Sequence, residues 1–115
     1  MTAYAMAHLR PVPPLHDGVF TYMERIQDTL DPFGGRFLVH GADAEVLEGP
    51  FEGAVVVIEF PDLERARAWY ASDAYQEILP LRTDNIPGVA ILAQGASPDH
   101  DSAALGRRMR EAQAG

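Results

Sequence analysis

One short run constrains the fold most strongly, the heptapeptide "AVVVIEF" at residues 54–60. It is almost entirely apolar and rich in β-branched side chains, which is typical of a central β-strand covered on both faces. Pro61 and Asp62 follow directly, and an aspartate here can cap the start of a helix by accepting a backbone hydrogen bond. The helix that follows has a predicted buried stripe of Leu63, Ala66, Trp69 and Tyr70. A strand joined directly to an amphipathic helix indicates a fold of mixed α and β elements.

The remaining elements are predicted from the spacing of apolar residues. Strand patterns run over residues 2–10, 36–41 and 87–95. Apolar positions at steps of three and four predict a helix over 15–30. A further helical turn restarts at Ser72 or Asp73, so the second helix is in two parts. The predicted order is therefore β-α-β-β-α-β.

The simplest packing of this order is an α+β, ferredoxin-like fold: a four-stranded antiparallel sheet in the order 4-1-3-2, with both helices on one face. We expect the first and third strands to run parallel, and the second to run antiparallel to the third. The other face of the sheet would expose Leu38, Val55 and Val57, too large an apolar patch for a monomer. The sequence therefore predicts a homodimer formed through that face.

Length and charge restrict the organisation of the chain and the classes of partner. The 115 residues predict one domain over residues 1–96, followed by a tail over 97–115 that is mobile or docked on a partner. The tail has a weak helical pattern around Leu105 and Met109, with Gly106 between them. Its charges sum to zero, so residues 1–96 carry the whole net charge of -8, which argues against binding to nucleic acid.

Absent residue types and segments exclude several other functions. The chain has no cysteine, so disulfides, thiolate catalysis, iron-sulfur clusters and cysteine-ligated zinc are excluded. It also has no lysine, which excludes Schiff-base chemistry through a lysine amine. We predict no cofactor. We also predict no membrane partner, since no apolar run approaches the roughly 20 residues of a spanning helix. Because no signal-peptide pattern is visible, a cytoplasmic location is expected.

Three blocks of the sequence carry a resemblance to a known family: "GGRFLVHG", "EVLEG" and "VVVIEFPDLERARAWYASDAYQEILPLR". They resemble the signature blocks of the domain-of-unknown-function family numbered 1330, in the dimeric alpha-beta barrel superfamily, over about residues 2 to 95. The resemblance implies the same fold and a homodimer whose two sheets face each other. It implies no established reaction. The chain departs from the family at "LDPFGG" and in the tail after Gly95.

Strand alternation suggests a site on the face of the sheet that the helices leave bare. It groups Tyr4 with Met6 and His8, Arg36 with Leu38 and His40, and Glu59 with Val55 and Val57. With the first and third strands taken as parallel, the catalytic candidates His8 and Glu59 fall at the same end as Arg36, and His40 falls at the other.

Two interpretations of this group remain open. In the functional one, Glu59 orients His8 as a general base, and Arg36 binds a carboxylate or enolate oxygen of a ligand that Tyr4 also contacts. In the structural one, Arg36 and Glu59 form an ion pair near the rim, and His8 is a half-buried strand residue. No metal site is predicted, because the sequence has no short-spaced pair of histidines.

The aromatic residues after the central strand allow a structural and a ligand-binding interpretation. Trp69 has the helical spacing of a core anchor. Tyr70 and Tyr75 either hydrogen-bond within the structure or point into a cleft between helix and sheet, where they would bind a ligand. Arg82 is expected to be solvated or paired with an acid.

The sequence leads to two main function hypotheses. The first is a homodimeric barrel protein that binds a small organic molecule in a mainly apolar pocket between sheet and helices. The second is a cofactor-free enzyme that acts by proton transfer on a small, aromatic or polyketide-like substrate. A purely structural dimer is a third class, and the sequence leaves open whether the protein is an enzyme and which ligand it binds.

Overall fold

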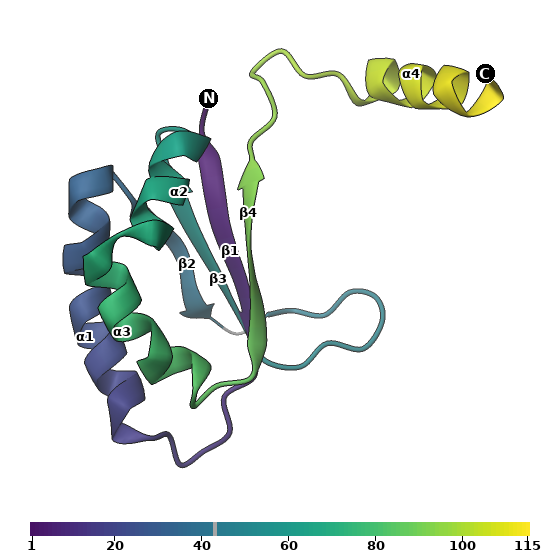
Figure 1. Ribbon diagram of the computed structural model, residues 1–115. Helices are drawn as coiled ribbons and strands as arrows, with labels where there is room; N and C mark the ends of the chain where they lie inside the picture. The colour runs from purple at the N-terminus through teal and green to yellow at the C-terminus, as the bar shows by residue number, and fades with distance from the viewer. Residues whose placement is uncertain (43) are drawn as a thin grey trace.

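Residues 1–42 and 44–115, which the computed structural model describes, form one four-stranded antiparallel sheet covered by helices on a single face (Figure 1). The elements in chain order are β1 Ala3–Leu9, α1 Asp17–Leu30, a 3₁₀ turn η1 Asp31–Phe33, β2 Arg36–Ala42, β3 Ala54–Phe60, α2 Leu63–Ala71, α3 Asp73–Thr83, β4 Gly88–Gln94 and α4 Ser102–Ala114. The predicted β-α-β-β-α-β order and the ferredoxin-like arrangement are confirmed, with α4 added after the last strand.

Local hydrogen bonds explain where the helices after β3 begin and end. Asp62 caps α2 as predicted, since its Oδ1 accepts a hydrogen bond from the Arg65 backbone N–H at 2.7 Å. Ser72 has an extended backbone and interrupts the helix. Its Oγ then accepts from the Tyr75 backbone N–H at 3.3 Å, which caps α3. The break at Ser72 lets α2 and α3 follow different directions.

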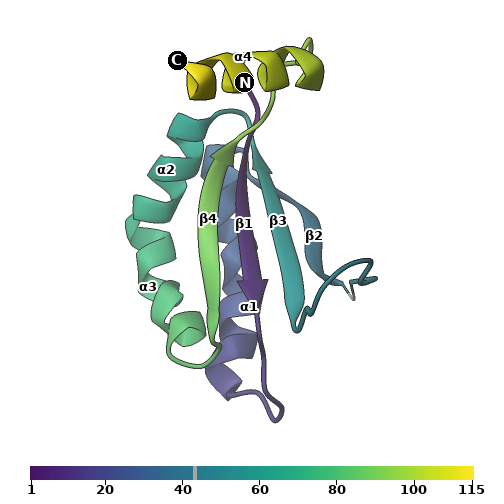
Figure 2. The same ribbon diagram turned by 90° about the vertical axis from the view of Figure 1, so that its right-hand side faces the viewer.

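The strand order is β2-β3-β1-β4, as predicted, but the direction predicted for one pair is wrong (Figure 2). Strand β1 runs antiparallel to β3, so Tyr4 lies opposite Glu59 and His8 lies opposite Val55. The crossover through α1 makes β1 parallel to β2, and β3 lies between them. Because β3 is antiparallel to β2, it must also be antiparallel to β1.

A β-bulge in β2 changes which side chains face the helices. Phe37 pairs with Ile58, but the next pair in register is Val39 with Val57, so Leu38 is an extra residue. One extra residue inverts the faces of the residues that follow it, here Val39 and His40, as far as the second register shift between His40 and Ala42. His40 therefore shares the helix-covered face, where its ring stacks on Phe37 at 4.0 Å between centroids. The prediction that His40 shares the bare face with Arg36 is wrong for this reason.

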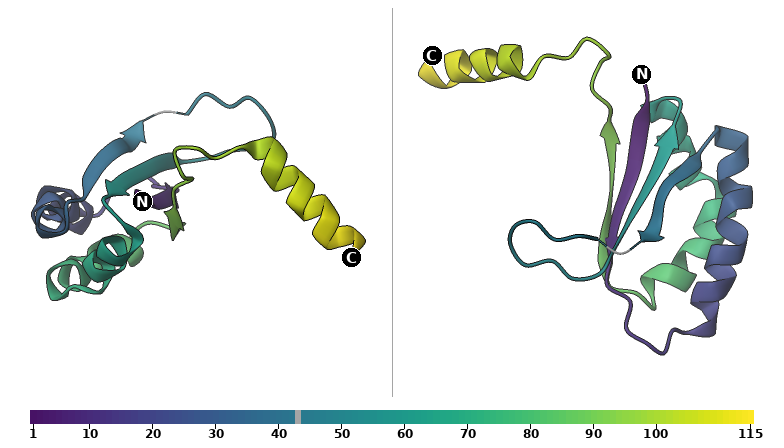
Figure 3. Two further views of the ribbon diagram at one scale, coloured as in Figure 1. Left: turned by 90° about the horizontal axis from the view of Figure 1, so that it is seen from above. Right: turned by 180° about the vertical axis from the view of Figure 1, so that it is seen from behind.

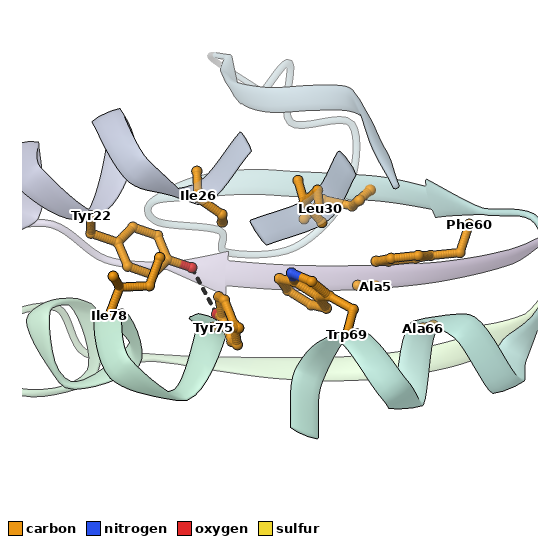
Figure 4. Close-up of a cluster of buried hydrophobic side chains, with 10 residues drawn as sticks. Ala5, Tyr22, Ile26, Leu30, Phe60, Ala66, Trp69, Tyr75 and Ile78 are labelled. Atoms are coloured by element: carbon orange, nitrogen blue, oxygen red, sulfur yellow. Dashed lines mark hydrogen bonds between the residues drawn. The ribbon is translucent and has the colours of Figure 1, made fainter. Parts of the chain in front are cut away.

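The core lies between α1, α2, α3 and the covered face of the sheet (Figure 4). Trp69 is confirmed as a core anchor, with 3% of its surface exposed. Its indole N–H donates to Thr29 Oγ1 at 3.0 Å, which satisfies the polar atom of the buried ring. The most deeply buried large side chains are Tyr75, Phe60, Leu30 and Ile78.

Two segments project beyond the uncovered face of the sheet (Figures 1 and 3). One is the β2–β3 loop, described here over residues 44–53. The other is α4, which forms despite Gly106 and has no buried residue. The tail after β4 thus contains a regular helix that its own domain does not cover.

We expect Ile78→Ala to lower the free energy of unfolding by about 2–5 kcal/mol, because it empties a fully buried position. Val12→Ala is the matched control, since Val12 is 72% exposed, and it should change this free energy by less than about 0.5 kcal/mol. Urea unfolding at one protein concentration measures both. Equal effects of the two substitutions would contradict the core described above.

Candidate functional site

A cavity of about 640 Å³ lies between the helices and the covered face of the sheet. Helix α2 packs directly on β1, β3 and β4, whereas α1 packs mainly on α3. Helices α1 and α3 stand farther from the sheet than α2 does, as Figure 1 shows. The cavity walls are mostly apolar and include Val19, Ile26, Phe37, Val56, Ile58, Trp69 and Leu92. The space between this helix pair and the sheet is thus apolar.

Three polar side chains from α1 and α3 meet at this cavity. The hydroxyl oxygens of Tyr22 and Tyr75 lie 2.7 Å apart and share a hydrogen bond (Figure 4). Arg82 Nε donates to the Tyr22 hydroxyl oxygen at 3.4 Å. The guanidinium carbon of Arg82 also lies 5.8 Å from the centre of the Tyr22 ring, within reach of a cation–π interaction. We call Tyr22, Tyr75 and Arg82 the polar cluster.

Arg82 is buried without an acidic partner among the described residues. Only 8% of its surface is exposed, and the ion pairs found between described residues involve Arg25, Arg36 and Arg65. The expectation that Arg82 is solvated or paired with an acid is therefore wrong within the described part of the chain. Helix α3 directs the Arg82 side chain toward α1. Its hydrogen-bonding partners are the hydroxyls of Tyr22 and Tyr75.

The electrostatics of the polar cluster keep it positively charged. Burial raises the pKa of Tyr22 well above its ordinary value, and the neighbouring Tyr75 raises it further. Burial by itself would lower the pKa of Arg82, but interactions with Tyr75 and Tyr22 outweigh burial and leave that pKa raised. At neutral pH the cavity thus presents the Arg82 guanidinium cation and the neutral hydroxyl of Tyr22. Such a set can bind an oxyanion.

Four of the six residues predicted to form a site lie on the uncovered face. They alternate with the buried residues of their strands and pair across the sheet as Tyr4 with Glu59 and Arg36 with Glu59. Arg36 Nε donates to Glu59 Oε1 at 3.0 Å. His8 lies at the opposite end of the strands, where its ring stacks on Phe51 at 4.6 Å and Nε2 contacts the Glu52 carbonyl oxygen.

The predicted proximity of His8 to Glu59 and Arg36 within one chain is therefore wrong. Its physical reason is the antiparallel direction of β1 and β3, which carries the end of β1 to the start of β3. The same register places His8 and His40 at one end of the sheet, contrary to the prediction. A catalytic role for His8 or Glu59 and ligand binding by Arg36 or Tyr4 stay predictions.

The other two predicted residues border the cavity. Tyr75 is nearly fully buried and belongs to the polar cluster, and Tyr70 borders the cavity while 40% exposed. The sequence analysis missed Tyr22 and Arg82 as site candidates. Their signal was helical spacing: Arg82 lies seven residues after Tyr75 on α3, on the same face, and Tyr22 belongs to the apolar stripe of α1.

Over residues 1–42 and 44–115, no group of three or more histidine, aspartate or glutamate side chains is arranged to hold a metal ion. Within the same residues, each helix is too short or too polar to cross a bilayer.

Comparisons with known proteins give both structural and sequence similarity. RPA0582, a protein of unknown function from Rhodopseudomonas palustris, is 18% identical with a TM-score of 0.63, over 84% of each chain. A dimeric ferredoxin-like protein of unknown function from Thermobifida fusca is 16% identical with a TM-score of 0.50, over 83% of this chain and 92% of that one.

SnoaB, a cofactor-independent oxygenase from Streptomyces nogalater, is 13% identical with a TM-score of 0.50, over 87% of this chain and 96% of that one. At these identities the structures share the fold alone. A comparison with curated proteins gives no match. Among protein families, the one described as Domain of unknown function (DUF1330) matches residues 2–96.

We expect Tyr22 to make stability fall at high pH. Since its pKa is raised in the folded state, the folded protein holds this proton above pH 10, where the unfolded chain releases it. The free energy of unfolding should therefore decrease by up to about 1.4 kcal/mol per pH unit above about pH 10 through this one group. Urea unfolding between about pH 9 and pH 11.5 measures the slope, and Tyr22→Phe should reduce it. Identical slopes for the two proteins would show that Tyr22 is not the group responsible.

Proposed function

The chain belongs to the DUF1330 family, and from the geometry of its cavity we propose that it binds a small organic acid, phenol or enol between its helices and its sheet. The observation that carries this proposal is a buried arginine without an acidic partner among the described residues, at the wall of an apolar cavity. An oxyanion of the ligand would accept hydrogen bonds from Arg82 and from the tyrosine hydroxyls.

The size and walls of the cavity support a ligand rather than a few water molecules. Pockets for small organic molecules commonly have volumes of about 300–1,000 Å³ and apolar walls with few polar groups. The ring centroids of Trp69 and Tyr75 lie 4.1 Å apart, and the two ring planes make an angle of 40°. Together with Phe37 they offer flat apolar surface to an aromatic or conjugated ligand.

Energetic cost also supports the proposal. A buried charge without a counter-ion destabilises a protein, and replacing it by an apolar side chain is often neutral or stabilising. A purely structural role for Arg82 would be better served by such a side chain. A ligand oxyanion would supply the missing negative charge.

We also propose that the protein is a homodimer. Large apolar side chains are exposed on the sheet strands, at Met6, Leu38, Val39, Val89 and Ile91. Burying such a patch against a second copy removes it from water. The similar structure from Thermobifida fusca is described as dimeric, which supports the same assembly here.

A cofactor-free enzyme acting by proton transfer is a second candidate function. His40 favours it, because this exposed residue borders the same cavity and an imidazole nitrogen can act as a general base. A C–H bond next to a carbonyl would break, the proton would move to the His40 ring nitrogen, and the resulting enolate oxygen would lie against Arg82. SnoaB offers a precedent for cofactor-independent chemistry on this fold.

Binding to the polar cluster is tested with a panel of aromatic acids, phenols and 1,3-diketones, by thermal shift and then calorimetry. Arg82→Met should weaken binding of an acidic hit by about 10- to 100-fold, because a hydrogen bond to a charged group contributes about 1.5–3 kcal/mol. The variant should unfold at a urea concentration equal to or above that of the parent protein.

Arg36→Met is the matched control, since it removes an arginine from the opposite face of the sheet. Its affinity for the same hit should be unchanged. Loss of binding in Arg36→Met with none in Arg82→Met would place the ligand at Arg36 and Tyr4 instead. The absence of any hit across the panel would count against a ligand-binding cavity.

The second candidate predicts exchange of an acidic C–H proton. A bound 1,3-diketone in deuterated water should exchange this proton faster with the protein than without it, as followed by NMR. His40→Gln should remove the acceleration while leaving the affinity within about threefold. An exchange rate that is equal with and without the parent protein would leave the protein a binder only, and an equal acceleration by His40→Gln would show that His40 is not the base.

A further inference from the structure

The two projecting segments flank the uncovered face of the sheet at opposite ends (Figures 1 and 3). Loop 44–53 leaves the end where β2 finishes and β3 begins. Helix α4 follows β4 and leaves the other end, near the start of β1. Any partner that covers this face must therefore lie between the two segments.

Each segment carries apolar side chains that its own domain leaves exposed. On α4, Leu105, Met109 and Ala112 are spaced by four and three residues, so they form one stripe. Leu105 is 39% exposed and Met109 is 63% exposed. In the loop, Val46 is 50% exposed and Leu47 is 86% exposed. Exposed apolar groups on projecting segments are characteristic of contact surfaces.

The two segments have opposite charge. Helix α4 contains Arg107, Arg108 and Arg110 against Glu111, a net charge of +2. The described loop residues contain Glu45, Glu48 and Glu52 and no basic residue, a net charge of -3. A basic helix with an exposed apolar stripe and an acidic loop with exposed apolar side chains are complementary surfaces.

We propose that α4 of one subunit docks on loop 44–53 of a second copy of this chain, reciprocally, at the two ends of the face-to-face dimer. This inference rests on the proposed homodimer and adds a specific contact to it. Each subunit supplies one helix and one loop, so the contact is made twice, as a two-fold axis requires.

Charge selects the direction of the two-fold axis. With the axis along the strands, like ends of the two sheets would meet, which brings basic α4 against basic α4 and acidic loop against acidic loop. With the axis across the strands, the α4 end of one subunit meets the loop end of the other. Only the second arrangement pairs opposite charges, and like-charge contacts would oppose the first.

The lengths fit this arrangement. A helix of 13 residues is about 20 Å long, and a strand of seven residues spans about 23 Å. A contact of α4 with its own loop would require the helix to return along the full length of its own sheet. A second copy in the crosswise arrangement brings a loop to α4 without that return.

Cross-linking tests the contact, since the natural chain has no cysteine. Chains carrying Leu47→Cys and chains carrying Met109→Cys, distinguished by a tag of different size, are mixed and treated with a short bis-maleimide. We expect a covalent heterodimer as the main product. Ala103→Cys, on the side of α4 opposite the stripe, is the matched control and should cross-link to Leu47→Cys at least fivefold less.

A doubly substituted chain with Leu47→Cys and Met109→Cys distinguishes the two sources of contact. Covalent dimers support docking between subunits, whereas internally linked monomers would overturn it. Sedimentation of the untreated protein distinguishes failure of the proposed homodimer from failure of the proposed contact between α4 and loop 44–53. A monomer in solution would overturn the homodimer and this inference together, and a dimer that cross-links no better than the control would overturn this inference alone.

Charge reversal gives a second measurement. Arg108 lies beside the apolar stripe, and Arg108→Glu should weaken dimerisation by about 3- to 10-fold at low salt. Adding Glu48→Arg to the same chain should restore the parent affinity, because the charges are exchanged and the contact is kept. Failure of the double variant to recover any affinity would contradict the pairing of these segments.

Discussion

Side chains point alternately to the two faces of a β-strand, and in this protein that alternation gives the faces of one sheet different surroundings. On β3, Ile58 and Phe60 lie under the helices, while Glu59 between them lies on the uncovered face beside Arg36. The cavity, the polar cluster and most of the core depend on the first face. The exposed apolar patch and the two projecting segments belong to the second.

The packing of the helices explains why a cavity lies at the covered face. Short side chains of β1, Ala3 and Ala5, and the closely packed Ala66 allow α2 to lie directly on the sheet. Beyond the break at Ser72, the large rings of Tyr22 and Tyr75 meet edge to face at 6.1 Å between centroids. These rings hold α1 and α3 together, and the space between this helix pair and the sheet stays open.

The proposed ligand site and the proposed dimer contact lie on opposite faces of the same sheet. A ligand between helices and sheet would therefore leave the uncovered face free for a second subunit. The two proposals can fail separately, because one depends on Arg82 and the other on α4 and loop 44–53. A single small domain could in this way combine a binding site with assembly.

The local pattern of residues was enough to predict the strands and the helices that cover the sheet, and the simplest packing of these elements gave the strand order. The run "AVVVIEF" and the stripe containing Trp69 show the residue spacing of a strand and of a helix, and Asp62 is a residue type that caps helices. Three features were decided only by the tertiary structure: the direction of β1 against β3, the bulge at Leu38 and the burial of Arg82. Each depends on a neighbour distant in the sequence, because a strand acquires its direction and register from the strand it pairs with, and a helix buries the side that another helix covers.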